Sequence, residues 1–379
     1  MVKVFKLDRY IMNNIKMAGP WITELEKKYV NEMMDHGWEN YDFVEKFEEE
    51  FANWHDRKFC LMTPCGTHAI HLILLALGIK EGDEVIVPEC TWTGSVAPVT
   101  YVGAKPVFAD INYDDWCLSI DSVKKNISEK TKAIIVVDLY GNMTDMRELE
   151  NISIKNNLYL IEDSAEALGS KYGSVRAGKF GIAGVHSFHR TKTITSGEGG
   201  ALLIDDSAVY ERAKFLRDHG RSNKIPYYTL EATPKYMPSN LQASLAYAQF
   251  KRINELIDKK RYLLHLYKKN LSDISDLQFN LENEKIFNGA WATSLIFGLD
   301  YKLNNFDIIE KLNFLKIPSR PFFYPLSSLP AYEKYKTGSK DKNPNAYDIS
   351  SRGITLPSHY DLTDSQVSFV CEGIKEIIK

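Results

Sequence analysis

The sequence has few of the features that mark a disulfide framework, a membrane span or a nucleic-acid binder. Its five cysteines are an odd number without a Cys-x-x-Cys pair, which argues against a disulfide scaffold or structural zinc and fits a reducing cytoplasm. No stretch approaches the ~20 apolar residues of a membrane span, and residues 1–8 contain no apolar signal region. The net charge is −3 and the lysines are scattered, so no nucleic-acid partner is expected. The histidines have no metal-ligand spacing, so no metal is expected either.

What the chain does contain is alternating apolar runs and helical patterns. Its 379 residues, 44% of them hydrophobic, allow a large core and suggest two domains. The alternation over the first 205 residues predicts βαβ units and a mostly parallel sheet, hence an α/β fold. The expected strands are 58–63, 84–88, 106–110, 133–138 and 158–163, with a closing pair at 184–188 and 200–205; expected helices include 67–77 and 143–156.

The second part of the chain changes in character near residue 251. Ser239 is expected to cap a long helix that runs to about Asn270 and bridges the two domains. Residues 318–330 contain four prolines, which predicts a rigid loop in place of a long helix. We therefore expect a large domain over residues 1–250 and a smaller α+β domain over residues 251–379.

Lys192 is the most informative residue. It lies among small and hydroxyl residues just before the glycine-rich turn at 197–200, which makes it a candidate for an amine that forms a Schiff base. The alternative is an ordinary lysine at a strand end. Asp163 ends the apolar run 158–163, 29 residues upstream. A Schiff-base lysine together with an acid for a pyridinium nitrogen is what pyridoxal phosphate requires, so this cofactor is predicted.

The phosphate of such a cofactor has candidate donors at the first strand–helix junction. Gly66 and Thr67 follow a predicted strand and open a helix, whose free N–H groups attract anions. No Walker lysine follows the glycine, which argues against a nucleoside-triphosphate loop. Ser187 is a further hydroxyl donor.

The cofactor ring also has candidate partners. Trp92 follows strand 84–88, at the strand end where α/β proteins bind ligands, and offers a flat face; the alternative is a core tryptophan. Glu166, three residues after Asp163, could reach the ring hydroxyl or the same face of the ring.

These motifs together resemble the StrS-type (DegT-like) sugar aminotransferases, which are pyridoxal-phosphate enzymes of aspartate-aminotransferase-like fold (fold type I). The likeness covers nearly the whole chain, and the segment 320–325 looks most like the perosamine-synthase branch. It implies that Lys192 is the catalytic Schiff-base lysine, that Asp163 is the pyridine partner and that Trp92 is the stacking residue. It also implies that the residues at the strand–helix junction and Ser187 bind phosphate, and that the enzyme is a homodimer with shared active sites.

Two departures from the family pattern concern anion binding, and one of them is Arg190, two residues before Lys192, where the family usually has a small or uncharged residue. The family often has Asn-Tyr-Arg-Met where this chain has Lys235-Tyr236-Met237-Pro238, so Lys235 is expected to neutralise cofactor phosphate across the subunit interface. The carboxylates of the amino donor then need another cation, for which Arg190 and Arg320 are candidates. His189 could face the substrate, although a hydrogen-bonded strand histidine is an equal alternative.

The expected activity is transfer of the amino group of L-glutamate to a keto acceptor. A nucleotide-linked 4-keto-6-deoxy sugar, used for capsule or lipopolysaccharide synthesis, is the first candidate. A small phosphorylated ketone such as dihydroxyacetone phosphate is the alternative, favoured by the unusual Arg190. A sugar dehydratase is disfavoured because such relatives carry histidine where this chain has Lys192. A non-catalytic binding protein of the same fold is the remaining alternative.

Overall fold

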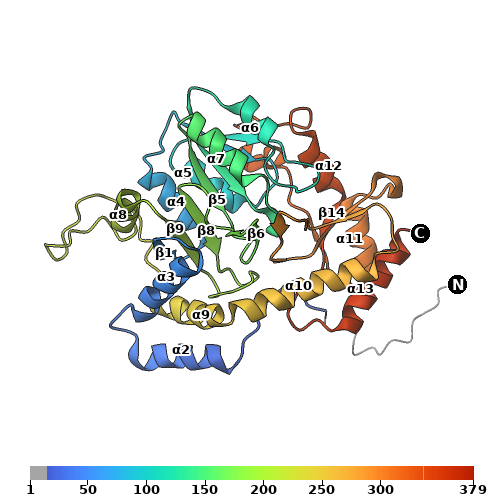
Figure 1. The fold of residues 1–379 in the computed structure, drawn as a ribbon, viewed down its shortest axis with the longest axis horizontal. Helices are drawn as coiled ribbons and strands as arrows, with labels where there is room; N and C mark the ends of the chain where they lie inside the picture. The colour runs from blue at the N-terminus through green and yellow to red at the C-terminus, as the bar shows by residue number, and fades with distance from the viewer. Residues whose placement is uncertain (1–14, 336) are drawn as a thin grey trace.

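A seven-stranded sheet forms the centre of the molecule in the computed structural model, which describes residues 15–335 and 337–379 (Figure 1). The expectation that residues 1–8 hold no signal region lies outside these residues. The strand order is β1-β9-β8-β5-β4-β2-β3, and only β9 runs against the others. The mostly parallel sheet is confirmed. The strands are β1 (Phe59–Thr63), β2 (Glu84–Pro88), β3 (Lys105–Ala109), β4 (Thr131–Val137), β5 (Tyr159–Asp163), β8 (Ala183–Ser187) and β9 (Gly200–Ile204).

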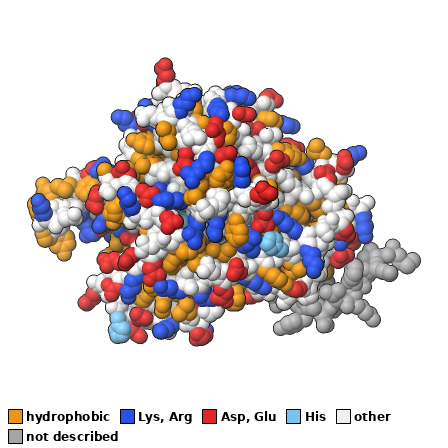
Figure 2. All heavy atoms as spheres, in the orientation of Figure 1, with side chains coloured by type: hydrophobic (Ala, Val, Ile, Leu, Met, Phe, Trp, Pro, Cys, Tyr) orange, Lys and Arg blue, Asp and Glu red, His pale blue; other side chains and the backbone are white. Residues whose placement is uncertain are grey.

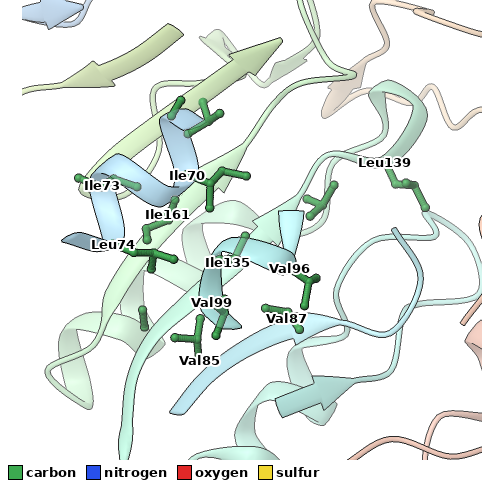
Figure 3. Packing of buried hydrophobic residues seen from close by; sticks show 14 of the residues in the cluster. Ile70, Ile73, Leu74, Val85, Val87, Val96, Val99, Ile135, Leu139 and Ile161 are labelled. Carbon is green, nitrogen blue, oxygen red and sulfur yellow. The ribbon is translucent and has the colours of Figure 1, made fainter. Parts of the chain in front are cut away.

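Helices cover both faces because the strands are apolar on both sides. In β2, Val85 and Val87 point to one face and Ile86 to the other, as the two-residue period of a strand requires. The face that carries Val85 and Val87 packs against Ile70 and other apolar residues of helix α4 (Gly66–Ala76) (Figure 3). Each such buried side chain stabilises the fold by about 1.5–3 kcal/mol. The helices of these layers are α3 (Asp42–Trp54), α4 (Gly66–Ala76), α5 (Ala97–Tyr101), α6 (Ile120–Asn126), α7 (Met146–Lys155) and α8 (Ser207–Leu216).

The long helix predicted from Ser239 to Asn270 is two helices, so that prediction is wrong in its middle. Ser239 does form a capping box at the start of α9 (Asn240–Lys251), and α10 (Ile253–Asn270) follows after a break at Arg252. Arg252 leaves helical geometry with its guanidinium bonded to the carbonyl of Trp21 and to Glu26. A contact with the start of the chain therefore breaks the helix. The N-terminal α2 (Glu24–His36) packs along α9.

A second, antiparallel sheet lies at the other end of the molecule, to the right in Figure 1. Its order is β10-β12-β14-β13, and its core is shared with α10, α11 and α13. This mixture of strands and helices agrees with the expected α+β character, while the division at residue 250 stays a prediction. The elements are β10 (Leu277–Phe279), β12 (Ser294–Phe297), β13 (Arg320–Pro321), β14 (Gly353–Thr355), α11 (Asn305–Phe314), α12 (Pro344–Arg352) and α13 (Asp364–Ile377).

The proline-rich segment 318–330 is a loop, as predicted. It contains the two residues of β13 and the short turn η4 (Leu326–Ser328), and η5 (Pro330–Tyr332) follows. The remaining short elements are β6 (Lys171–Tyr172), β7 (Val175–Arg176), β11 (Ile286–Phe287), η1 (Thr93–Ser95), η2 (Leu139–Gly141) and η3 (Leu299–Tyr301).

The surface mixes both signs of charge. Acidic and basic side chains are interspersed with apolar ones over the face in Figure 2. Within residues 15–335 and 337–379, no helix combines the length and apolar character of a membrane span. The same residues contain no cluster of three His, Cys, Asp or Glu side chains fit to hold a metal ion.

Candidate active site

A cavity of about 650 Å³ opens at the carboxyl ends of the parallel strands. Asp163 is the last residue of β5 and Ser187 the last of β8, while Trp92 follows β2 and Gly66 begins α4 just after β1. Because parallel strands end at one edge of a sheet, these four positions converge although the chain separates them widely. Of the predicted site residues, the cavity is lined by Gly66, Thr67, Trp92, Asp163, Glu166, Ser187, His189, Lys192 and Arg320.

Lys192 lies at the bottom of the cavity in an ion pair with Glu166. Its Nζ is 3.1 Å from Glu166 Oε1, and the two side chains are 13% and 6% exposed. The other oxygen of Glu166 accepts the backbone N–H of Tyr140 at 3.1 Å. Burial raises the pKa of Glu166, and the charge of Lys192 opposes that rise. Glu166 therefore holds the amine, a contact that the sequence did not indicate.

Asp163 is buried and held by two donors. Ser95 Oγ donates to Oδ2 at 2.6 Å, and the backbone N–H of Ala165 donates to Oδ1 at 3.1 Å. Burial raises the pKa of Asp163, while these two hydrogen bonds and the charge of Lys192 act in the opposite direction. Ser95 was not predicted, because a serine in a short turn carries no distinguishing signal.

The N-terminus of α4 forms the part of the cavity that suits a phosphate. Within the described chain, no side chain caps this helix. A Cβ on Gly66 would lie 3.2 Å from the Cβ of Ser187, and a Cβ on Gly200 would lie 2.5 Å from the Gly66 nitrogen. Glycine is thus required for the close packing that places the helix end beside the Ser187 hydroxyl. Helix N–H groups and hydroxyls are a fitting donor set for a phosphate.

Two tryptophans border the remaining space. Trp92 is 61% exposed, so a face of its ring is open to a flat ligand. Trp291, which the sequence analysis missed, lies with its ring centroid 3.8 Å from Lys192 Nζ. Its Nε1 donates to the carbonyl of Thr191 at 2.7 Å. A lysine between a carboxylate and an aromatic face has little freedom to move.

The predicted anion-binding residues are divided between the cavity and its surroundings. Arg320 lines the cavity, whereas Arg190 is exposed and does not. Burial lowers the pKa of His189, as do the nearby charges of Lys192 and both arginines, against the opposing effect of Glu198.

Lys235 lies outside the cavity of its own chain. It is exposed and bonded to Asp218 Oδ1 at 2.5 Å. Its predicted role concerns a second subunit, so it stays a prediction, as does the substrate role of Arg190.

Comparison with known proteins agrees with this geometry. Residues 20–375 match the DegT/DnrJ/EryC1/StrS aminotransferase family. The chain belongs to this family. It is 37% identical to the GDP-perosamine synthase of Escherichia coli O157:H7, covering 96% of this chain and 99% of that one. It is 36% identical to the GDP-perosamine synthase of Vibrio cholerae, covering 95% and 98%.

Solved structures give the same result. A protein of Streptococcus pneumoniae, Spr1654, described as a sugar aminotransferase, superposes with a TM-score of 0.90 at 27% identity, covering 96% of this chain and 98% of that one. It has been solved in PLP and PMP forms. The predicted family, fold type I architecture and cofactor are therefore confirmed. The protein is a sugar aminotransferase that uses pyridoxal phosphate.

Proposed function

We propose that this enzyme transfers the amino group of L-glutamate to a nucleotide-linked 4-keto-6-deoxy sugar for a surface polysaccharide. The observation that carries the proposal is a cavity lined by the Lys192 amine, paired with Glu166, and by the buried carboxylate of Asp163. The chain is also similar over nearly its whole length to GDP-perosamine synthases. A further relative supports the polysaccharide context: the spore coat polysaccharide biosynthesis protein SpsC of Bacillus subtilis, at 30% identity.

Pyridoxal phosphate, when bound, supplies a carbonyl for the lysine amine and a ring that withdraws electrons from the reacting carbon. Lys192 provides the amine, and Glu166 and Trp291 fix its position. The Lys192 amine, when it is free, would move a proton at the α-carbon of the amino donor and at C4 of the acceptor. Its place at the base of the cavity lets one lysine serve both substrates.

The other residues would hold the cofactor beside that amine. Asp163, whose carboxylate is ordered by Ser95, would bind the pyridine nitrogen. Trp92 would lie against the ring, and the start of α4 with Ser187 would bind the phosphate. Arg320, at the exposed rim, binds the anionic groups of donor or acceptor.

A visible-absorption titration tests the proposal. L-Glutamate is expected to remove the absorption band of the lysine-bound cofactor, and a nucleotide 4-keto-6-deoxy sugar is expected to restore it. Failure of the sugar to restore the band, with the glutamate step intact, would remove the proposed acceptor. A Lys192→Ala variant that keeps full activity would remove the proposed catalytic residue.

A small phosphorylated ketone is the second candidate acceptor. Arg320 lines the cavity, and Arg190 lies two residues before Lys192 in the chain, so a second cation adjoins the lysine segment. A parallel cuvette with dihydroxyacetone phosphate separates the candidates, since only the true acceptor restores the band. A dehydratase would consume the sugar without consuming glutamate.

We also propose a homodimer in which Lys235 reaches the partner's cofactor phosphate. The segment 217–239 extends from the body of the molecule near α8 (Figure 1) and exposes Ile225, Tyr227, Tyr228 and Leu230. Exposed apolar groups of this kind mark protein contacts. Sedimentation should give a dimer, and Lys235→Ala should weaken cofactor binding more than Lys224→Ala, a change at another exposed lysine of the same segment.

A further inference from the structure

Two exposed aromatic side chains meet at the mouth of the cavity. Phe306, in the first turn of α11, is 64% exposed, and Tyr324 is 39% exposed. Their ring centroids are 6.4 Å apart and their planes are inclined by 29°. A single exposed aromatic residue is ordinary, but an adjoining pair at the rim of a ligand cavity is a surface prepared for a flat ligand.

The order of residues from the base outward matches the parts of a nucleotide sugar. Lys192 is half-buried, with 13% of its side chain exposed, whereas Arg320 and Tyr324 line the cavity and are exposed to solvent. Phe306 does not line the cavity but adjoins Tyr324 on the outside. Within the described residues Arg320 has no carboxylate partner, so its charge is available to an anion. A sugar at Lys192 and a diphosphate at Arg320 would bring the base to the ring pair.

Both rings are exposed, but hydrogen bonds hold the backbone near each of them in place. The side chain of Asn304 accepts the backbone N–H groups of Phe306 and Asp307, each at 3.0 Å, which caps α11 at this residue. On the other side, Pro325 forms a β-bridge with Cys90, whose thiol bonds the carbonyl of Phe323 at 3.0 Å. A preorganised aromatic surface loses little entropy when a ligand binds.

We propose that Phe306 and Tyr324 form a platform on which the nucleobase of the acceptor stacks, with Arg320 binding the adjoining diphosphate. The inference rests on the proposed function and narrows it, because a small phosphorylated ketone has no group that could reach or use the rings. Aromatic stacking accepts every base, so the platform explains retention of a nucleotide and not selection among the bases.

Calorimetric titration of the holoenzyme with guanosine diphosphate and with inorganic pyrophosphate tests the platform. Phe306→Ala and Tyr324→Ala are each expected to weaken guanosine diphosphate binding about 5- to 150-fold, the range for loss of one stacking ring. Pyrophosphate binding should stay unchanged in both variants. Tyr324→Phe, which keeps the ring, should bind guanosine diphosphate like the wild type.

The matched control is Phe314→Ala, because Phe314 lies on the same helix, is 87% exposed and does not line the cavity. It should bind guanosine diphosphate normally. Equal binding by Phe306→Ala and the wild type, or wild-type binding of guanosine diphosphate no tighter than of pyrophosphate, would overturn the platform. The glutamate-dependent loss of the cofactor band, recorded on the same samples, tests transamination separately: an intact band change with no nucleotide binding rejects the platform alone.

Discussion

Replacement of Glu166 by glutamine should weaken the hold on the side chain of Lys192 and destabilise the cofactor-free protein. The Coulomb attraction between the two groups across 3.1 Å is about 5 kcal/mol at an effective dielectric constant of about 20. Removal of two nearly buried charges from water offsets much of this, so the net coupling energy of the pair should be about 1–2 kcal/mol. Glutamine keeps the shape and the bond to the Tyr140 N–H but not the charge. A double-mutant cycle of Glu166→Gln and Lys192→Met therefore isolates the charge interaction.

Urea unfolding of the cofactor-free wild type, the two single variants and the double variant gives the free energies of unfolding that the cycle requires. The control is the same cycle with Asp218→Asn and Lys235→Met, because that ion pair is more exposed. The coupling energy should be about 1–2 kcal/mol for Glu166 and Lys192 and below about 1 kcal/mol for the exposed pair. A coupling energy near zero for Glu166 and Lys192 would refute the view that Glu166 holds the amine by its charge.

Three further outcomes are expected. Lys192→Ala should abolish both transamination and the visible band of the lysine-bound cofactor, and the absorption spectrum of the variant checks this. Asp163→Asn should lower kcat by about 100-fold or more, whereas Ser95→Ala, which removes one hydrogen bond of about 1 kcal/mol, should lower kcat about 5-fold. Equal losses of kcat for the two variants in steady-state assays would contradict the view that Ser95 only supports Asp163. Burial lowers the pKa of His186 to about 3, so below its ordinary pKa of 6.5 the unfolded chain binds a proton that the folded chain excludes. The stability that depends on neutral His186 is complete above pH 6.5 and falls by about 2 kcal/mol between pH 7 and 5. Between these pH values, urea unfolding should show a decrease in the free energy of unfolding that is about 2 kcal/mol larger for the wild type than for His186→Gln.

The sequence predicted the base of the cavity because local patterns mark it. Buried Val/Ile-rich strands are recognisable from composition and length, and the rule that ligands bind at the carboxyl ends of parallel strands then placed Asp163, Ser187 and Trp92 together. The turn into α4 was equally visible, since glycine followed a strand and preceded a helical pattern.

What the sequence did not predict depends on contacts between distant segments. The break at Arg252 has no proline or glycine to announce it and arises from bonds to Trp21 and Glu26, more than 200 residues away. The position of Trp291 was equally hidden in the sequence, because Ala290 and Ala292 flank it and no hydrophobic periodicity marks it. Only the folded chain brings its ring over Lys192.

The base and the rim of the cavity belong to different sheets, so the residues that perform the chemistry are separate from those that contact the rest of the acceptor. The base consists of strand ends of one continuous sheet, whereas Arg320 belongs to β13 of the second sheet. The rim is joined to the base beside Trp92, where the N–H of Leu326 donates to the carbonyl of Glu89 at 2.7 Å. Substitutions at the rim can thus alter affinity for the acceptor while Lys192 and Glu166 keep their geometry. Rim variants such as Tyr324→Ala should therefore raise the KM of the acceptor and leave the glutamate half-reaction intact, whereas variants of the base should impair both halves.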